Sequence, residues 1–345
     1  MVRQPMVRSL KPIAGWISWG GSLLSGRGRP SDRPPNAIER GDAYLISRIR
    51  RGELGSRAPA DSSIKRLDNH GEPFIVLDVV SALGPRIPAK VRRGLIARLM
   101  KTRRNDDAWA YSPRTGIDSD TTASAIRSLD RLGQHVSLNG LAQFFNPQTG
   151  LYHTFHDAGF ADRTLGLQFP PHTFKKHQGS HSCVLANVYS LLWERGQLPS
   201  LDHRFLQSVQ KPDGNWLSYY YPSPFYATRL FTELLVSMGS DYDGYMRRTL
   251  NGLLAVDTPN SVTQIAEVLI SLACLRHRFA SERAEIEARA AVMIHELAKA
   301  QIDDGSWPGD MIWESMMEDG TVEWAEDHFR VRSTALCIRA LQAWG

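Results

Sequence analysis

Cysteine is scarce in this chain of 345 residues, which contains only Cys183, Cys274 and Cys337. The number is odd and the three positions lie far apart, which argues against a disulfide framework and favours a reducing compartment. We therefore expect a cytoplasmic protein. Hydrophobic residues make up 42% of the chain and charged residues 22%, so a large packed core is feasible and general disorder is excluded.

Long apolar runs are also missing. No stretch reaches the roughly 20 apolar residues that a membrane span requires. Residues 13–24 follow basic residues and faintly resemble a signal peptide, but three glycines interrupt them and a clear small-x-small cleavage site is lacking. We expect residues 1–38 to form a flexible basic extension, in which Trp16 and Trp19 could touch a membrane interface.

The chain has no excess of acidic residues, and its net charge is +5. Basic residues gather in the extension and again over residues 86–104. No motif that reads RNA or DNA accompanies them, so nucleic acid is not expected as a partner. An anionic substrate or a membrane surface would suit this charge, and a solvated helix face explains the second cluster most simply.

Polar turns that end in an aromatic residue recur along the chain, and internal repeats of this kind indicate a repeat architecture. They lie at residues 105–109, 146–152, 210–216 and 301–307. The last two are close copies with the pattern Gln-x-x-Asp-Gly-x-Trp.

Each turn separates two helical patterns of different character. The second helix of each pair is apolar on more than one face, as expected for a helix buried on both sides, whereas the first is amphipathic. The expected inner helices are 74–83, 121–132, 183–194, 226–238, 262–275 and 333–344. The expected outer helices are 44–51, 91–104, 138–145, 201–210, 245–255 and 284–301. Because no alternating strand pattern of useful length competes, the sequence predicts an all-α, closed (α/α)6 barrel over residues 39–345.

Two carboxylates, Asp118 and Asp120, lie two residues apart just before an expected inner helix. Carboxylates this close disfavour each other's ionised forms, so at least one pKa should be raised, while a helix N-terminus favours the charged form of the other. Such a pair can keep one carboxyl protonated near neutral pH, as a general acid requires. Simple capping of the helix is the alternative.

The repeated turns resemble the QW-type repeats of the prenyltransferase and squalene–hopene/terpene cyclase superfamily, which is built on (α/α)6 barrels. In that superfamily the Gln and Trp tie one repeat to the next. The run 118–123, Asp-Ser-Asp-Thr-Thr-Ala, looks like the Asp-x-Asp-Asp-Thr-Ala motif of class II terpene cyclases. It is closer still to the Asp-x-Asp-Thr-Thr variant of the drimenyl diphosphate type. The resemblance implies that Asp120 donates a proton to a terminal alkene or epoxide and that Asp118 is its partner. Thr121 stands where many members carry another Asp, so fewer charges would tune the acid.

This chemistry also requires aromatic faces near the carbocation and cations near a diphosphate. The candidate cation-stabilising residues are Trp109, Tyr111, Trp216, Tyr219, Phe225, Tyr226, Trp313 and Phe329. The candidate diphosphate-binding residues are Lys175, Lys176, Arg229, Arg330 and Arg332. Ordinary core packing and solvated surface charge are the alternatives for each residue taken alone.

The resemblance implies a class II-like terpene cyclase that acts on a linear prenyl diphosphate or related polyprene. Protonation itself needs no cofactor, although Mg²⁺ could accompany a diphosphate. Class II cyclases usually work between two barrels and this chain has residues for one, so the loop 146–181, the extension or a second chain would have to close the cavity. Prenyl chain length, product skeleton and diphosphate retention stay open.

A second constellation favours a different chemistry. Five histidines, including His177 and His181, fall within 29 residues and are followed by Cys183. Protein prenyltransferase β subunits of the same superfamily bind zinc with an Asp, a Cys and a His, so a zinc-dependent prenyl-transferring enzyme is an alternative, with His181, Cys183 and His177 as ligands. The spacing matches no standard zinc signature. A non-catalytic barrel that binds an isoprenoid or a protein is a third possibility.

Overall fold

The computed structural model describes residues 37–56, 71–104, 107–111, 116–155, 179–198, 200–316 and 322–345. All of them belong to one compact unit. Residues 1–36 lie outside the described residues, so the proposed boundary between an extension and the barrel stays a prediction. No helix among the described residues is long and apolar enough to cross a bilayer.

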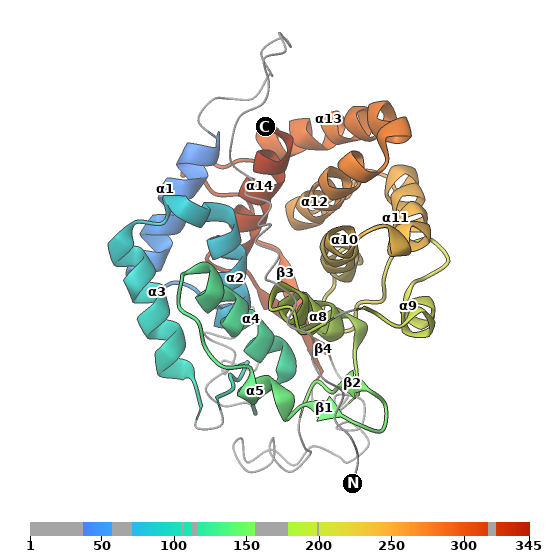
Figure 1. Ribbon diagram of the computed structural model, residues 1–345. Helices are drawn as coiled ribbons and strands as arrows, with labels where there is room; N and C mark the ends of the chain where they lie inside the picture. The colour runs from blue at the N-terminus through green and yellow to red at the C-terminus, as the bar shows by residue number, and fades with distance from the viewer. Residues whose placement is uncertain are drawn as a thin grey trace. The chain divides into compact units, whose positions relative to one another are not determined.

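Six helices form a closed inner ring (Figure 1). They are α2 (Glu72–Leu83), α4 (Ser119–Arg131), α8 (Ser182–Glu194), α10 (Tyr226–Met238), α12 (Val262–Arg278) and α14 (Val331–Trp344). Each packs against the next in chain order, and α14 packs against α2 to close the ring. Most of their residues are buried, which explains why their sequences are apolar on more than one face.

The outer helices alternate with the inner ones along the chain. They are α1 (Ala37–Arg51), α3 (Ala89–Thr102), α5 (Asn139–Ala142), α9 (His203–Val209), α11 (Asp243–Ala255) and α13 (Arg283–Lys299). Each long outer helix buries a single stripe; α3, for example, buries Val91, Leu95 and Leu99, which are four residues apart. The predicted (α/α)6 barrel is thereby confirmed.

The tryptophans of the repeated turns tie each turn to the inner helix that follows. The backbone N–H groups of Trp109, Trp216 and Trp307 each donate to a threonine hydroxyl, over 3.0, 3.1 and 3.2 Å. The acceptors occupy equivalent positions in the first turn of an inner helix: Thr122, Thr228 and Thr334. This recurring hydrogen bond gives a partner to a buried backbone N–H group of the turn that is not bonded within a helix or a sheet.

Two short hairpins, which the sequence analysis did not predict, accompany the helices. A short antiparallel pair, β1 (Phe145–Asn146) and β2 (Leu151–Tyr152), follows α5, which is shorter than the predicted helix 138–145. A longer hairpin, β3 (Met311–Met316) and β4 (Val322–Glu326), precedes α14. Asp319-Gly320 stands between these strands in the sequence, and Asp-Gly is a strong hairpin signal.

Candidate active site

Asp118 and Asp120 lie at the start of α4, and each is only 4% exposed. Asp118 is the N-cap: its Oδ1 accepts a hydrogen bond of 2.7 Å from the backbone N–H of Thr121. The capping interpretation is therefore correct for Asp118. Asp120 lies in the first turn of the helix and is not the cap, so its carboxyl is free for other contacts.

Asp120 contacts side chains from two other parts of the ring. Its Oδ1 accepts a hydrogen bond of 2.7 Å from the amide Nδ2 of Asn187 on α8. Its Oδ2 lies 3.2 Å from the hydroxyl of Tyr221, in the segment before α10. The two oxygens of one buried carboxyl therefore have different partners.

The two carboxyls differ in how readily they lose a proton. Burial raises the pKa of Asp118 to about 7, although the hydrogen bond from Thr121 opposes the shift. Burial raises the pKa of Asp120 well above its ordinary value; the Asn187 hydrogen bond lowers it, and the charge of Asp118 raises it further. Burial and the charge of Asp118 therefore both shift Asp120 toward its protonated form.

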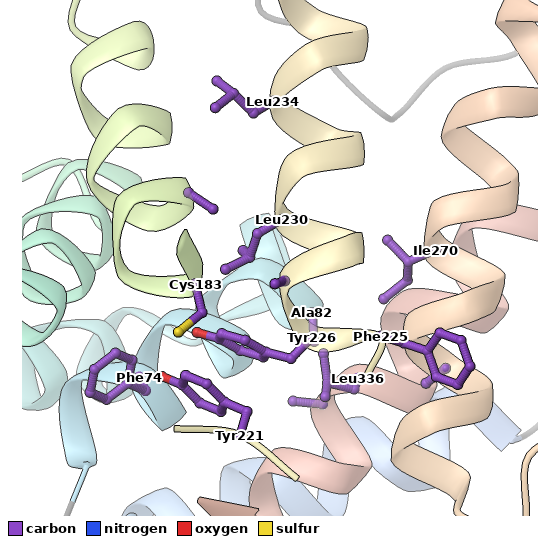
Figure 2. Close-up of a cluster of buried hydrophobic side chains, with 14 of the residues drawn as sticks. Phe74, Ala82, Cys183, Tyr221, Phe225, Tyr226, Leu230, Leu234, Ile270 and Leu336 are labelled. Atoms are coloured by element: carbon purple, nitrogen blue, oxygen red, sulfur yellow. The ribbon is translucent and has the colours of Figure 1, made fainter. Parts of the chain in front are cut away.

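Aromatic side chains surround this pair on two sides. Tyr221 stacks on Tyr226 with ring centroids 3.4 Å apart, and both point toward Cys183 and Phe74 in Figure 2. Phe74 in turn belongs to a group of three rings with Tyr111 and Trp313. The Tyr111 and Trp313 centroids are 5.2 Å apart, and burial together with the charge of Asp118 raises the pKa of Tyr111. Tyr111, Tyr226 and Trp313 are therefore gathered around the acid pair.

The other predicted aromatic residues lie elsewhere. Trp109 and Trp216 are buried in the repeat turns, where their ring N–H groups donate to Leu99 O and Thr249 Oγ1. Figure 2 shows the Phe225 ring beside Ile270, away from Tyr226. A role for these three rings in cation stabilisation stays a prediction that gains no support from their contacts.

Two further predicted rings lie at the margins. Tyr219 is 37% exposed and stacks on His181, with centroids 4.1 Å apart. The Phe329 backbone carbonyl accepts a hydrogen bond from the Tyr44 hydroxyl of α1. Phe329 therefore packs toward the outer helices, and its proposed contact with substrate stays untested.

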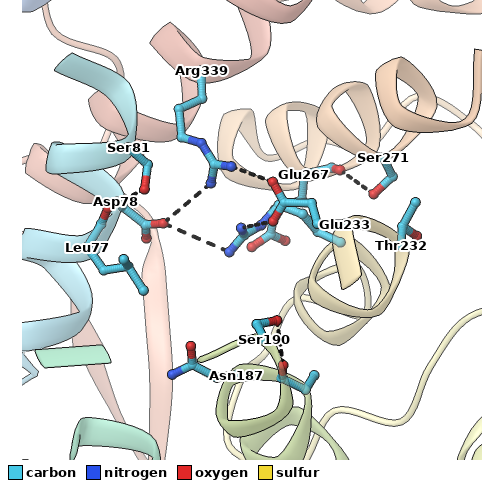
Figure 3. Close-up of polar contacts among 12 residues, drawn as sticks. Leu77, Asp78, Ser81, Asn187, Ser190, Thr232, Glu233, Glu267, Ser271 and Arg339 are labelled. Atoms are coloured by element: carbon cyan, nitrogen blue, oxygen red, sulfur yellow. Dashed lines mark hydrogen bonds and ion pairs between the residues drawn. The ribbon is translucent and has the colours of Figure 1, made fainter. Parts of the chain in front are cut away.

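Among the described candidates for diphosphate binding, Arg229 and Arg332 lie together and Arg330 lies apart. Arg229 and Arg332 are each 3% exposed and lie inside the ring. Arg229 pairs with Glu233 over 3.0 Å, and Arg332 pairs with Glu267 over 3.2 Å. Asp78 lies 3.9 Å from Arg229 and 3.3 Å from Arg332. It also lies 3.9 Å from Arg339, and Figure 3 marks this contact with a dashed line.

The remaining cations give no common site. Arg330 lies before α14 and pairs with Asp304 over 2.8 Å, and its guanidinium lies 5.5 Å from the Tyr44 ring centroid. Lys175 and Lys176 lie outside the described residues. The diphosphate site therefore stays a prediction.

The zinc alternative gains no support from the described residues, which contain no group of three or more potential metal-binding side chains. His181 Nδ1 lies 2.8 Å from the Thr154 hydroxyl. Burial raises the pKa of Cys183 to about 11, which disfavours the thiolate that zinc requires. His177 lies outside the described residues.

Asn187 is a site residue that the sequence analysis missed, together with Arg127, whose Nη1 donates to the Asn187 amide oxygen over 2.7 Å. The sequence does contain a pattern that points to these residues. Polar residues recur seven positions apart on the inner helices, and seven residues make close to two full helical turns. The pairs are Asp120 with Arg127, Asn187 with Glu194, and Arg332 with Arg339. One face of an apolar helix is therefore polar, and that face points into the barrel.

Comparison with known proteins gives one match in sequence and several in structure. No protein-family model matches the chain. A segment of 155 residues is 30% identical to an ent-copalyl diphosphate synthase of Streptomyces sp. (strain KO-3988). This match covers 43% of the present chain and only 25% of the length of that enzyme.

The solved structures cover much more of the chain. A variant of the type II terpene cyclase MstE from Scytonema, in complex with the substrate geranylgeranyl dihydroxybenzoate, matches with a TM-score of 0.71 and 20% identity, over 89% of this chain and 96% of that one. An ent-copalyl diphosphate synthase from Streptomyces platensis matches with a TM-score of 0.56 and 18% identity, over 79% of this chain and 49% of that one. The drimenyl diphosphate variant of the motif is not tested by these matches. The resemblance to class II terpene cyclases is confirmed at the level of the fold: this chain has the barrel of the type II terpene cyclases.

Proposed function

We propose that the protein is a terpene cyclase that starts its reaction by protonating a linear prenyl substrate. The observation that carries the proposal is the buried carboxyl of Asp120, which lies beside Asp118 and whose pKa is raised because it is desolvated and close to a second carboxylate. An alkene is a very weak base, so its protonation needs a strong acid in a site from which water is excluded. Asp120 is the general acid, and Asp118 raises its pKa.

The proton leaves Asp120 from Oδ2, because Oδ1 already accepts the Asn187 amide. The carboxylate left behind accepts the Tyr221 hydroxyl at that same oxygen. The Asn187 amide bonds Oδ1 in both states, so the new charge meets donors already in place, and little reorganisation accompanies proton transfer. The rings of Tyr111 and Trp313 offer surface to the developing carbocation. The Tyr226 ring already stacks on Tyr221 and lies 5.6 and 5.5 Å from the guanidiniums of Arg229 and Arg332.

The hydrocarbon of the substrate lies on the aromatic side of the acid. The described residues line a cavity of about 20 Å³ next to Asn187, where the aromatic residues Phe74, Tyr221 and Tyr226 meet charged residues that include Arg127, Arg229 and Glu233. About 10–15 Å³ of such space holds one water molecule, so a prenyl chain does not fit there. Charged walls are also a poor environment for a hydrocarbon.

The substrate classes that we propose are a prenyl diphosphate and a prenylated aromatic acid, with the prenyl chain length left open. MstE binds geranylgeranyl dihydroxybenzoate as substrate, and the other similar proteins are ent-copalyl diphosphate synthases. A peripheral membrane contact or a second chain that closes the cavity is compatible with either class.

Incubation with candidate substrates tests the proposal. The purified protein is incubated with farnesyl diphosphate, geranylgeranyl diphosphate, geranylgeranyl dihydroxybenzoate and squalene, with and without EDTA, Mg²⁺ or Zn²⁺. Products are analysed by mass spectrometry after dephosphorylation where needed. A cyclic isomer of one substrate is expected, and Asp120→Asn should abolish it.

Asp202→Asn is the control for loss of a carboxylate at the start of a helix, because Asp202 caps α9 and accepts from the Arg204 backbone N–H. It should retain full activity. Full turnover by Asp120→Asn would refute the proposed acid. Stoichiometric zinc and a transferred prenyl group would instead support the prenyltransferase alternative.

A further inference from the structure

A chain of hydrogen bonds runs from the surface of the barrel to the acid. The Glu194 side chain is 37% exposed and accepts from Arg127 at both oxygens, over 2.8 and 3.1 Å. Arg127, which is buried, donates to Asn187 Oδ1 over 2.7 Å, and Asn187 Nδ2 donates to Asp120 Oδ1 over 2.7 Å. Three side chains thus connect solvent to one oxygen of Asp120.

The side chain of Asn187 lies between Arg127 and Asp120, and its hydrogen-bonding partners fix the orientation of its amide group. An asparagine amide can in principle be turned by 180°, which exchanges its donor and its acceptor. A guanidinium has only donors, so the amide group must present its oxygen to Arg127. The NH₂ group must then face Asp120, where it also bonds Ser124 Oγ over 2.7 Å.

This direction decides where the proton of Asp120 sits. An oxygen that faces an N–H donor cannot also present a hydrogen to it, so Oδ1 stays unprotonated. The proton is confined to Oδ2, beside the Tyr221 hydroxyl. If the amide were reversed, its carbonyl would accept a hydrogen bond from a protonated Oδ1. The proton of the acid would then sit on Oδ1 and not on Oδ2.

We infer that Arg127 is a positioning residue which, through Asn187, holds the acidic proton on Oδ2 of Asp120. The inference rests on the proposed function for its catalytic meaning, but the location of the proton is a property of the protein alone. Arg127 touches neither carboxyl of the pair directly; its effect passes through the amide and through its charge.

Several groups besides Arg127 affect ionisation of Asp120. Asp118 lies on the same element and Tyr226 on α10; Cys183 lies on α8, and Tyr221 precedes α10. None of them is changed by a substitution at Arg127. A shift in the pKa of Asp120 in the Arg127 variant therefore reports two losses: the hydrogen bond from Arg127 to the Asn187 amide and the guanidinium charge.

The test compares Arg127→Gln with Arg131→Gln. Both arginines belong to α4 and both bond Glu194, but among the described residues only Arg127 bonds Asn187. Glutamine at position 127 offers both donor and acceptor, so it no longer requires the amide oxygen of Asn187 to face it. The Asp120 backbone carbonyl, which accepts from Asn187 Nδ2 over 3.1 Å, is then the acceptor-only backbone group that still favours the original direction. The expected result for Arg127→Gln is a kcat about tenfold lower, an unchanged KM and an alkaline limb of the pH profile about one unit higher. Arg131→Gln should move none of these by a comparable amount.

A titration without substrate separates this inference from the proposed function. The carboxyl of Asp120 is followed by infrared or carbon NMR spectroscopy and assigned with Asp120→Asn. The pKa of Asp120 should rise in Arg127→Gln even if no substrate is ever turned over. Should Arg127→Gln fold poorly, Asn187→Ala leaves the Arg127–Glu194 pair intact and should raise the same pKa. An Asp120 titration that is identical in the wild type and in the folded variant at Arg127 or Asn187, or one that moves equally in Arg131→Gln, would overturn the inference.

Discussion

The Tyr221 hydroxyl lies 3.2 Å from Oδ2 of Asp120, while its ring stacks on Tyr226 at a centroid distance of 3.4 Å. The stack holds the ring in place, so the hydroxyl stays beside the oxygen that carries the proton. It can accept from the protonated acid and donate to the carboxylate that follows proton transfer.

Tyr221→Phe removes this hydroxyl and keeps the stack. A hydrogen bond to a charged group contributes about 1.5–3 kcal/mol, so kcat should fall roughly 10- to 100-fold while KM changes little. Steady-state kinetics on the wild type and the variant provide the measurement. Tyr219→Phe is the control, since Tyr219 stacks on His181, and an equal loss in both variants would contradict the assignment.

The pH dependence of turnover should have a falling alkaline limb, because Asp120 must be protonated to act and its pKa lies well above the ordinary value. Asp118 has a pKa of about 7, so it is ionised above neutral pH, where its charge disfavours ionisation of Asp120. Asp118→Asn removes that charge and keeps a competent N-cap. The alkaline limb of the pH profile should therefore move to lower pH in Asp118→Asn.

The measurement is kcat against pH for the wild type, Asp118→Asn and Asp202→Asn. Only the variant at Asp118 should shift the limb downward. A shift to higher pH would mean that Asp118 stabilises the carboxylate of Asp120 rather than its protonated form.

The barrel and its acid pair could be predicted from the sequence because both have local signals. The apolar faces of the inner helices located the helix starts to within about two residues, and the predicted helix 121–132 falls on α4. Asp118 and Asp120 are neighbours in the chain, and their burial follows from their place at the start of an inner helix. The hairpin β3–β4 was missed because its two strands are only six and five residues long, so they show no long alternating pattern.

The hydrogen-bond partners of Asp120 could not be predicted from the sequence. Asn187 lies 67 positions from Asp120 and Tyr221 lies 101 positions from it, so only the closure of the ring brings them together. The interior position of Arg229 and Arg332 was missed for a related reason. Asp78 and Glu267, which pair with them, come from other inner helices, and the sequence alone suggested either a diphosphate ligand or a solvated surface charge.

The charged interior of the barrel makes a stability prediction. Asp78 is 6% exposed and lies within 3.9 Å of Arg229, Arg332 and Arg339. Asp78→Asn keeps the shape of the side chain but leaves buried guanidiniums with less counter-charge. Removing one partner of a buried pair costs about 3–5 kcal/mol, and the free energy of unfolding should fall by that order.

Urea denaturation of Asp78→Asn and Asp243→Asn checks this value. The Asp243 side chain is 46% exposed and pairs with Arg278 over 2.7 Å, so its loss should change stability by less than about 1 kcal/mol. Equal losses in the two variants would mean that the interior network contributes no more than a surface pair.

Gly71 precedes α2 and places its backbone against Trp313 of the three-ring group. Its φ is +66°, and a Cβ at this position would overlap the indole ring of Trp313. Gly71→Ala must therefore displace the indole as well as adopt a strained backbone. Gly133 has a φ of +83°, and a Cβ added there would meet nothing within 4 Å, so Gly133→Ala isolates the strain, about 1–2 kcal/mol.

Calorimetry should show a clearly larger fall in Tm for Gly71→Ala than for Gly133→Ala. Turnover should fall only in the variant at Gly71, because Trp313 packs edge-on against Tyr111, with centroids 5.2 Å apart, beside the acid pair. Equal effects in the two variants would mean that Trp313 moves aside freely and that its position contributes nothing to the site.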